Sequence, residues 1–144
     1  MRSKDLAIGA LIAVAVGACT DSDHDLSQAA VTWRCGGPLD GGFAEILLAE
    51  EPIQSPYPPA PYVLVLLNQP AGSLAPGSWT VNVPAADAFY SPVDDWHEKA
   101  TSGTVRIARI DSTSVHGSLQ LHFPSRNVAT DFDAFWMLSS GIGC

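Results

Sequence analysis

Apolar and polar residues alternate most regularly in the C-terminal third of the chain. Val115, Leu119, Leu121 and Phe123 stand at every second position or a multiple of it, with polar residues between them. The same period continues from residue 128 to residue 136. A period of two is typical of a strand with one face in the core. We therefore predict an antiparallel meander of three strands, over residues 103–111, 114–123 and 128–138.

The turns of this meander determine its expected register. A four-residue turn over 124–127 pairs Phe123 with Val128, and across the preceding turn Asp111 pairs with Val115. The inner face then receives the large apolar side chains of the meander, namely Leu119, Leu121, Phe123, Phe132 and Trp136. The same register predicts an outer row of Arg106, Gln120 and Asp131, and it turns Arg109 inward beside Gly117.

Upstream segments predict further strands. Apolar and polar residues alternate around Trp33 and Trp79, residues 43–49 favour a strand, and the unbroken apolar run 62–67 is typical of a strand covered on both faces. Residues 52–61 hold five prolines, which lack amide donors and predict an extended connector between two sheet edges.

One helix is expected, over about residues 92–100. Ser91 can cap it, Pro92 suits the first helical position, Asp94 follows three residues after the cap, and Lys99 lies near the far end. The whole pattern predicts an all-β fold, either an antiparallel sandwich or a small closed barrel of about seven strands. It would include this short helix and the C-terminal three-strand meander.

The N-terminal residues predict export and lipid attachment. Arg2 and Lys4 precede an apolar run from Leu6 to Val16, and Gly17-Ala18-Cys19 follows. Basic start, apolar run and small residues are typical of a secretory signal, and a cysteine directly after the cleavage point is typical of bacterial lipoproteins. Eleven residues at about 1.5 Å each cannot cross about 30 Å of hydrocarbon as a helix. We expect residues 1–18 to be removed and Cys19 to carry the acyl chains that hold the protein on the membrane.

The remaining chain divides into a tether and one domain. Residues 19–30 are acidic and show no periodicity, which predicts a flexible tether, and 31–144 is long enough for a single β domain. By similarity to bacterial lipoproteins, Thr20 in place of an aspartate after Cys19 favours the outer membrane of the cell envelope. Cys35 and Cys144 are then the two cysteines left, and an oxidising compartment predicts a disulfide between them. The alternative is two free thiols.

Charge limits the partners. The chain has a net charge of −8, with 7 basic and 15 acidic residues. Nucleic-acid binding needs clustered Lys and Arg to release counterions, so nucleic acid is not an expected partner. The same charge disfavours adhesion to anionic lipid, which leaves the acyl chains as the expected means of membrane attachment.

One resemblance follows from the C-terminal pattern. Gly103-Thr104-Val105, the strand Val115 to Phe123, Phe132-Asp133-Ala134 and the terminal Cys144, together with the signal, resemble uncharacterised β-rich lipoproteins of myxobacterial type. Asp131 stands where that pattern has glycine. The resemblance implies a fold and a cellular localisation, and it implies no activity.

Candidate chemistry is sparse. His24 lies among aspartates of the tether, His97 lies one helical turn from Asp94, and His116 and His122 are too far apart along a strand to share a metal ion. Asp131 and Asp133 are expected to face solvent. The sequence contains none of the common nucleophile, zinc or phosphate-loop motifs. We therefore expect no catalytic, cofactor or metal residues.

Three function classes stay open. The leading one is a non-enzymatic envelope lipoprotein whose β domain presents a surface, with an envelope protein as a possible partner. The second is a barrel that binds a small apolar ligand. The third is an enzyme with a site assembled from distant residues, such as His97, Arg109 and two carboxylates. Oligomeric state is open.

Overall fold

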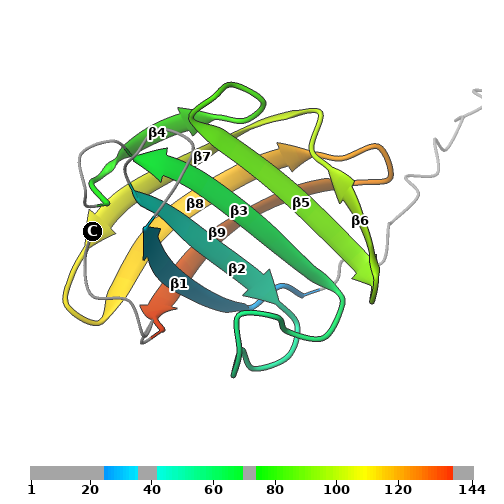
Figure 1. The fold of residues 1–144 in the computed structure, drawn as a ribbon, viewed down its shortest axis with the longest axis horizontal. Helices are drawn as coiled ribbons and strands as arrows, with labels where there is room; N and C mark the ends of the chain where they lie inside the picture. The colour runs from blue at the N-terminus through cyan, green and yellow to red at the C-terminus, as the bar shows by residue number, and fades with distance from the viewer. Residues whose placement is uncertain (1–24, 36–41, 70–73, 138–144) are drawn as a thin grey trace, which may run out of the picture.

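The computed structural model describes residues 25–35, 42–69 and 74–137. Over these residues the protein is all-β, and its nine strands form one curled, mixed sheet in the order β4-β7-β8-β9-β1-β2-β3-β5-β6 (Figure 1). The strands are β1 (Gln28–Cys35), β2 (Gly42–Ala49), β3 (Tyr62–Gln69), β4 (Gly77–Thr80), β5 (Ala86–Val93), β6 (Trp96–Lys99), β7 (Ser102–Ile110), β8 (Ser114–His122) and β9 (Asn127–Trp136). The described residues contain no helix.

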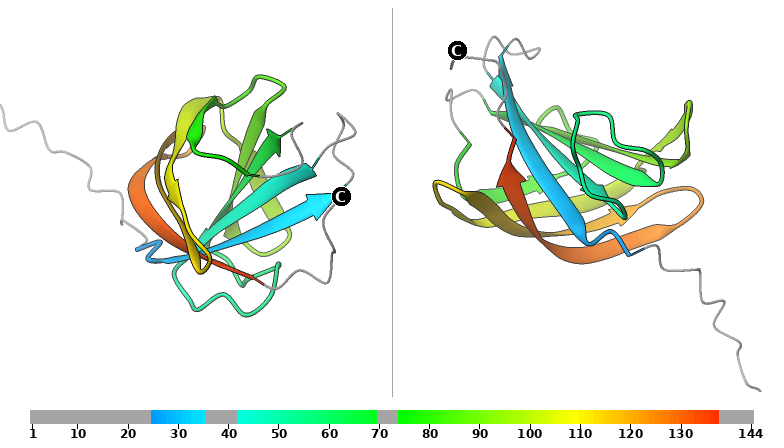
Figure 2. Two further views of the ribbon diagram at one scale, coloured as in Figure 1. Left: turned by 90° about the vertical axis from the view of Figure 1, so that its left-hand side faces the viewer. Right: turned by 90° about the horizontal axis from the view of Figure 1, so that it is seen from below.

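One parallel pairing joins the two halves of the sheet. β9 lies beside β1 through Ala30↔Phe135 and Val31↔Trp136, whereas the other strand pairs are antiparallel. The C-terminal meander is thereby attached to the N-terminal strands. Figure 2 shows the resulting sheet curling around its own inner face. The expectation of an all-β fold is confirmed, with nine strands in place of about seven.

The inner face of the curl is filled with side chains. Buried residues from eight strands, from Val31 in β1 to Ala134 in β9, form one hydrophobic cluster. The side chains that the alternation predicted to point inward all belong to this cluster or pack against it: Trp33, Trp79, Leu119, Leu121, Phe123, Phe132 and Trp136. Burial of so many large side chains removes several hundred Å² of apolar surface from water.

A second, smaller cluster covers the outer face of β1 and β2. It contains Ala30, Leu47, Ala49 and Ile53. Ile53 comes from the proline-rich segment, which therefore folds back over the sheet. The expected crossing between sheet edges is wrong, because the flanking strands β2 and β3 are antiparallel neighbours.

The expected helix over about 92–100 is also wrong. These residues form the end of β5, a turn at Asp94-Asp95 and the strand β6, with Val93 paired to Trp96. Between Tyr90↔Glu98 and Val93↔Trp96, two residues of β5 face one residue of β6, which is a β-bulge. Pro92 lies in the bulge, where its missing amide interrupts no ladder hydrogen bond. Asp95 adopts a positive φ of 64°, which aspartate tolerates in turns.

The meander is present, but its register differs from the expectation. The difference is two residues between β8 and β9; between β7 and β8 it is one residue at the turn and two residues beyond Ala108. The last pair of β8 and β9 is His122↔Asn127, so the four-residue loop is 123–126, and Leu119 faces Thr130. Arg106 pairs with Ser118, and Ser118 with Asp131, so the outer row contains Ser118 in place of Gln120. A shift of two residues preserves the faces, because side chains alternate with a period of two. Leu119 and Phe132 are therefore still buried.

Three smaller differences concern the upstream strands. β1 begins at Gln28, three residues earlier than expected, and Leu26 is already buried. β3 is not covered on both faces along its length, since buried and half-buried residues alternate in it. β4 ends at Thr80, and Val83 lies beyond it in an isolated bridge to Ala86.

Candidate functional site

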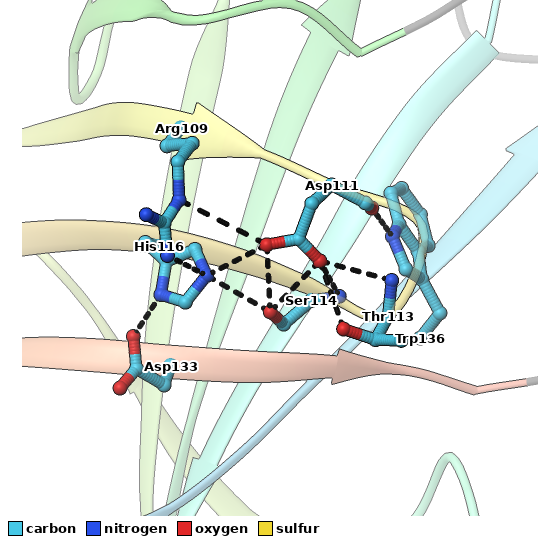
Figure 3. Close-up of polar contacts among 7 residues, drawn as sticks. All are labelled: Arg109, Asp111, Thr113, Ser114, His116, Asp133 and Trp136. Atoms are coloured by element: carbon cyan, nitrogen blue, oxygen red, sulfur yellow. Dashed lines mark hydrogen bonds and ion pairs between the residues drawn. The ribbon is translucent and has the colours of Figure 1, made fainter.

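The densest group of polar side chains lies on the outer face beside the β7–β8 turn. His116 of β8 is at its centre, with Arg109 from β7, Asp111 from the turn, Ser114 from the start of β8 and Asp133 from β9 (Figure 3). We call these five residues the His116 cluster. The antiparallel register explains how they meet, since Arg109 and Asp133 are both cross-strand partners of His116.

A β-bulge brings Arg109 into this cluster. Ile107 pairs with Gly117 and Arg109 with His116, which leaves Ala108 as the extra residue. The extra residue reverses the alternation, so Arg109 lies on the exposed face. The expectation that Arg109 points inward beside Gly117 is therefore wrong.

Asp111 organises the turn. Its Oδ1 accepts hydrogen bonds from the backbone amides of Thr113 and Ser114, at 3.0 and 2.9 Å, and from the Thr113 hydroxyl at 2.9 Å. Hydrogen bonds to the charged form stabilise it. The bonds from Thr113, with smaller contributions from His116 and Ser114, hold the pKa of Asp111 far below its ordinary value. The Trp136 indole donates to the Asp111 carbonyl at 3.1 Å, which ties β9 to the same turn.

His116 lies between two carboxylates. Its Nδ1 donates to Asp133 Oδ1, and its Nε2 lies 3.1 Å from Asp111 Oδ2. The hydrogen bond to Asp133 and then that to Asp111 raise the pKa of His116. Arg109, whose Nη2 lies 2.8 Å from Nε2, favours the neutral ring instead. Two carboxylates thus raise the pKa of His116, and one exposed guanidinium opposes them.

The cluster contains the elements of a nucleophile–base–acid chain. Ser114 Oγ lies 2.9 Å from His116 Nε2, and Asp133 accepts from the other ring nitrogen. This is the contact order of a serine hydrolase triad. Asp111 changes its chemistry, however, because Ser114 Oγ also donates to Asp111 Oδ1 at 3.2 Å. The carboxylate beside the hydroxyl would repel a developing oxyanion, and the hydrogen bond to Asp111 turns the hydroxyl proton away from His116.

Two open hollows border this face. One, of about 540 Å³, lies between the segment from Asp25 to Ala29 and the outer surface of β7–β9, and His116, Asp131 and Asp133 line part of it. The other, of about 550 Å³, is lined by residues of β4, β7, β8 and β9 around Arg106. Both are open to solvent, in contrast to the filled inner face.

The structure separates the other residues that the sequence singled out. His97 lies on β6, where it meets the edge of Phe89 at 5.7 Å between ring centroids and has no helical neighbour. Glu98 of the same strand contacts Ser125 in the β8–β9 loop, whereas Arg109 lies at the opposite end of the meander. The assembled site of His97 and Arg109 is therefore not formed. His122 contacts Asn127 and stays apart from His116.

Four of the residues that the sequence singled out lie beyond structural test. Cys19, Cys144 and His24 fall outside the described residues, and so does the side chain of Cys35. The predicted lipid attachment and disulfide thus stay predictions. Over the described ranges, no three His, Cys, Asp or Glu side chains are placed to hold a metal ion, and no helix is long and apolar enough to cross a membrane.

Sequence reasoning found His116 and Asp133 on the outer face but did not bring Asp111 and Ser114 to them. A signal was available. Asp111 is followed at two and three residues by Thr113 and Ser114, a spacing typical of an Asp side chain that caps its own turn.

Comparisons with known protein families, with curated proteins and with solved structures found no match. The assignment of a function therefore depends on the residues of this chain alone.

Proposed function

We propose that the protein is a lipid-anchored lipoprotein of the cell envelope, held by acyl chains on Cys19 and located at the outer membrane. The observation that carries this proposal is the sequence Val16-Gly17-Ala18-Cys19 directly after an uncharged apolar run. The described fold fits it, because Leu26, seven residues after Cys19, is already packed in the domain. The resemblance to lipoproteins of myxobacterial type supports the same address.

The domain acts as a non-enzymatic surface that meets a partner in the envelope. Two features support this role. The inner face, which would be the binding site of a carrier, is occupied by Leu119, Leu121, Phe132 and other core side chains. The hollows on the outer face are open to solvent, whereas small-molecule sites are mostly enclosed. In this proposal the nine-stranded sheet is a half-open barrel packed around a solid core.

Anchoring is tested by intact mass and detergent partitioning of the full chain expressed in a bacterium that processes lipoproteins. The expected product lacks residues 1–18, carries acyl groups on Cys19 and enters the detergent phase. Cys19→Ser should yield an unacylated protein, whereas Cys35→Ser, the matched control, should leave acylation unchanged. Recovery of the wild-type chain as an unmodified, water-soluble species would refute the proposal.

A serine hydrolase is the second candidate, and the contact between Ser114 Oγ and His116 Nε2 favours it. A fluorophosphonate probe that labels activated serines distinguishes the two functions. We expect no labelling of the wild type at neutral pH, because the Ser114 hydroxyl is held by Asp111. Labelling that disappears in Ser114→Ala but persists in Ser118→Ala would establish the hydrolase and overturn the non-enzymatic assignment.

A further inference from the structure

Exposed apolar side chains gather at one end of the sheet. Among the described residues, Tyr57, Val93 and Trp96 are 79, 58 and 50% exposed. Val93 and Trp96 are cross-strand partners beside the β5–β6 turn, and Tyr57 projects from the proline-rich loop. The backbone amide of Ala60 donates to Asp94 Oδ1 at 3.1 Å, which fastens that loop to the turn. We call Tyr57, Val93 and Trp96 the apolar end.

The register places the start of β1, where the chain enters the domain, at this same end of the sheet. Gln28 pairs with Ala49, Ala49 with Tyr62, and Tyr62 with Ser91, so one row runs from the start of β1 to the end of β5. In Figure 1 the beginning of β1, the loop between β2 and β3, and the β5–β6 turn lie along one edge of the curled sheet.

The length of the tether keeps this end near the anchor. Six peptide units separate Cys19 from Asp25, the first described residue. At up to about 3.6 Å per residue, they reach roughly 20 Å when fully extended. Four strand spacings of about 4.8 Å, from β1 to β6, cover a similar distance across the sheet. An acylated Cys19 would therefore hold the apolar end within reach of the bilayer surface.

We propose that the apolar end docks on the bilayer that carries the anchor, with Trp96 and Tyr57 in the interfacial layer. This inference rests on the proposed lipid attachment. Trp and Tyr favour that layer because their rings are apolar and their N–H or O–H groups remain near water. Asp94, Asp95 and Glu51 are exposed at the same end and would be repelled by anionic lipid. The docking surface thus suits zwitterionic headgroups.

Tryptophan quenching tests the proposal on the acylated full-length mature protein. The protein is reconstituted in vesicles of phosphatidylethanolamine and phosphatidylcholine, with and without phosphatidylcholine brominated on its acyl chains. Trp96→Phe gives the emission of the remaining tryptophans, which is subtracted. We expect bromolipid to quench the Trp96 emission, and this quenching to disappear in Trp96→Phe and to weaken when phosphatidylglycerol is added.

Two further variants place a tryptophan at matched positions in the Trp96→Phe background. Val83 is 44% exposed but lies beside Ala86, at the end of the sheet opposite to Val93. Tyr57→Trp should restore quenching, whereas Val83→Trp should not. Both positions are well exposed, so neither substitution disturbs the core.

The outcomes separate docking from anchoring. Intact mass establishes acylation of each sample before the vesicles are made. An acylated protein whose Trp96 is not quenched, or is quenched no more than a tryptophan at position 83, overturns the docking proposal and leaves the anchor standing. An unacylated protein overturns both. Trp96 shielded only after an envelope protein is added to the vesicles would show that the apolar end binds a protein partner, which also overturns docking on lipid.

Discussion

Gly117 is a position where a single added methyl group should disturb the fold directly. It lies in the middle of the meander, between Ile107 of β7 and Phe132 of β9. A Cβ atom on Gly117 would lie 2.3 Å from the Arg106 carbonyl oxygen and 2.6 Å from Phe132 Cζ. The first contact is with backbone of the neighbouring strand, so side-chain rotation cannot relieve it. The second would displace the phenyl ring from the core.

The expected cost follows from overpacking. Extra carbon atoms in a filled core cost about 1–3 kcal/mol, and the close backbone contact places Gly117→Ala toward the upper part of this range. For a domain of this size, the unfolding temperature should fall by roughly 4–12 °C. Thermal unfolding followed by circular dichroism measures the change.

Gly77→Ala is the matched control. A Cβ atom on Gly77 in the edge strand β4 would lie 3.5 Å from the nearest atom of Trp79, an ordinary van der Waals contact. Alanine there loses less backbone entropy on folding than glycine, so the variant should equal or exceed the wild type by up to about 1 kcal/mol. Equal stability of the Gly117→Ala and Gly77→Ala proteins would refute the reasoning, because both substitutions add the same group to a strand glycine.

Four further predictions concern the polar cluster, a turn and the cysteines. The pKa of His116 is raised above its ordinary value of 6.5. The ionised ring therefore stabilises the fold fully below pH 6.5, and this stabilisation is lost as the pH rises through the folded-state pKa. The unfolding temperature of the wild type should fall on the alkaline side, and that of His116→Gln should fall less. The pKa of Asp111 is lowered from 3.8. The Asp111 carboxylate therefore stabilises the fold above pH 3.8, and this stabilisation is lost as the pH falls toward the folded-state pKa. Asp111→Asn should remove this loss of stability in acid. Asp95 has a φ of 64°, a backbone conformation that glycine adopts freely and valine does not. Asp95→Gly should therefore be neutral or stabilising, and Asp95→Val should destabilise the protein by about 1–2 kcal/mol. Similar unfolding temperatures for the two variants would contradict the turn geometry. Peptide mapping without reductant should find a disulfide between Cys35 and Cys144. This bond would close a loop of about a hundred residues and stabilise the folded protein by roughly 4–5 kcal/mol. Free alkylatable thiols at both positions would disprove it.

The alternation of apolar residues was sufficient to predict the meander, because one face of each of its strands is buried. The same alternation could not fix the register to better than two residues. Phe123↔Val128 and His122↔Asn127 both close a four-residue loop and both keep the apolar rows on one face. The structure selects the second, in which the Phe123 amide donates to the Arg126 carbonyl within the loop. That hydrogen bond joins backbone groups of the loop, so the pattern of apolar residues cannot predict it.

The helix was predicted from end signals alone, and those signals have a second meaning. Ser91-Pro92 begins many helices, but a proline also fits a bulge in an edge hairpin, because neither position needs its amide. The residues that follow decide between the two. Val93 and Trp96 flank two aspartates, and the two-residue loop between them closes the hairpin. Tertiary contact supports this choice, since Tyr90 of β5 stacks beneath Arg126 and packs on Phe123 of the meander.

Arg109 joins the His116 cluster because of the bulge at Ala108. Ile107 and Ile110 are three residues apart, yet Ile107 is buried and Ile110 packs against the same core. A regular strand would turn one of the two away from the core, so the extra residue lets β7 use both isoleucines. The same insertion moves Arg109 to the outer face, opposite His116 and close to Asp111. In Ile107-Ala108-Arg109-Ile110 the two core isoleucines are three residues apart, whereas core residues elsewhere in the strand are two apart. This change of spacing marks the residue at which the alternation of faces reverses. The place of Arg109 in the cluster is therefore a consequence of how the core is packed, and no motif in the sequence marks it.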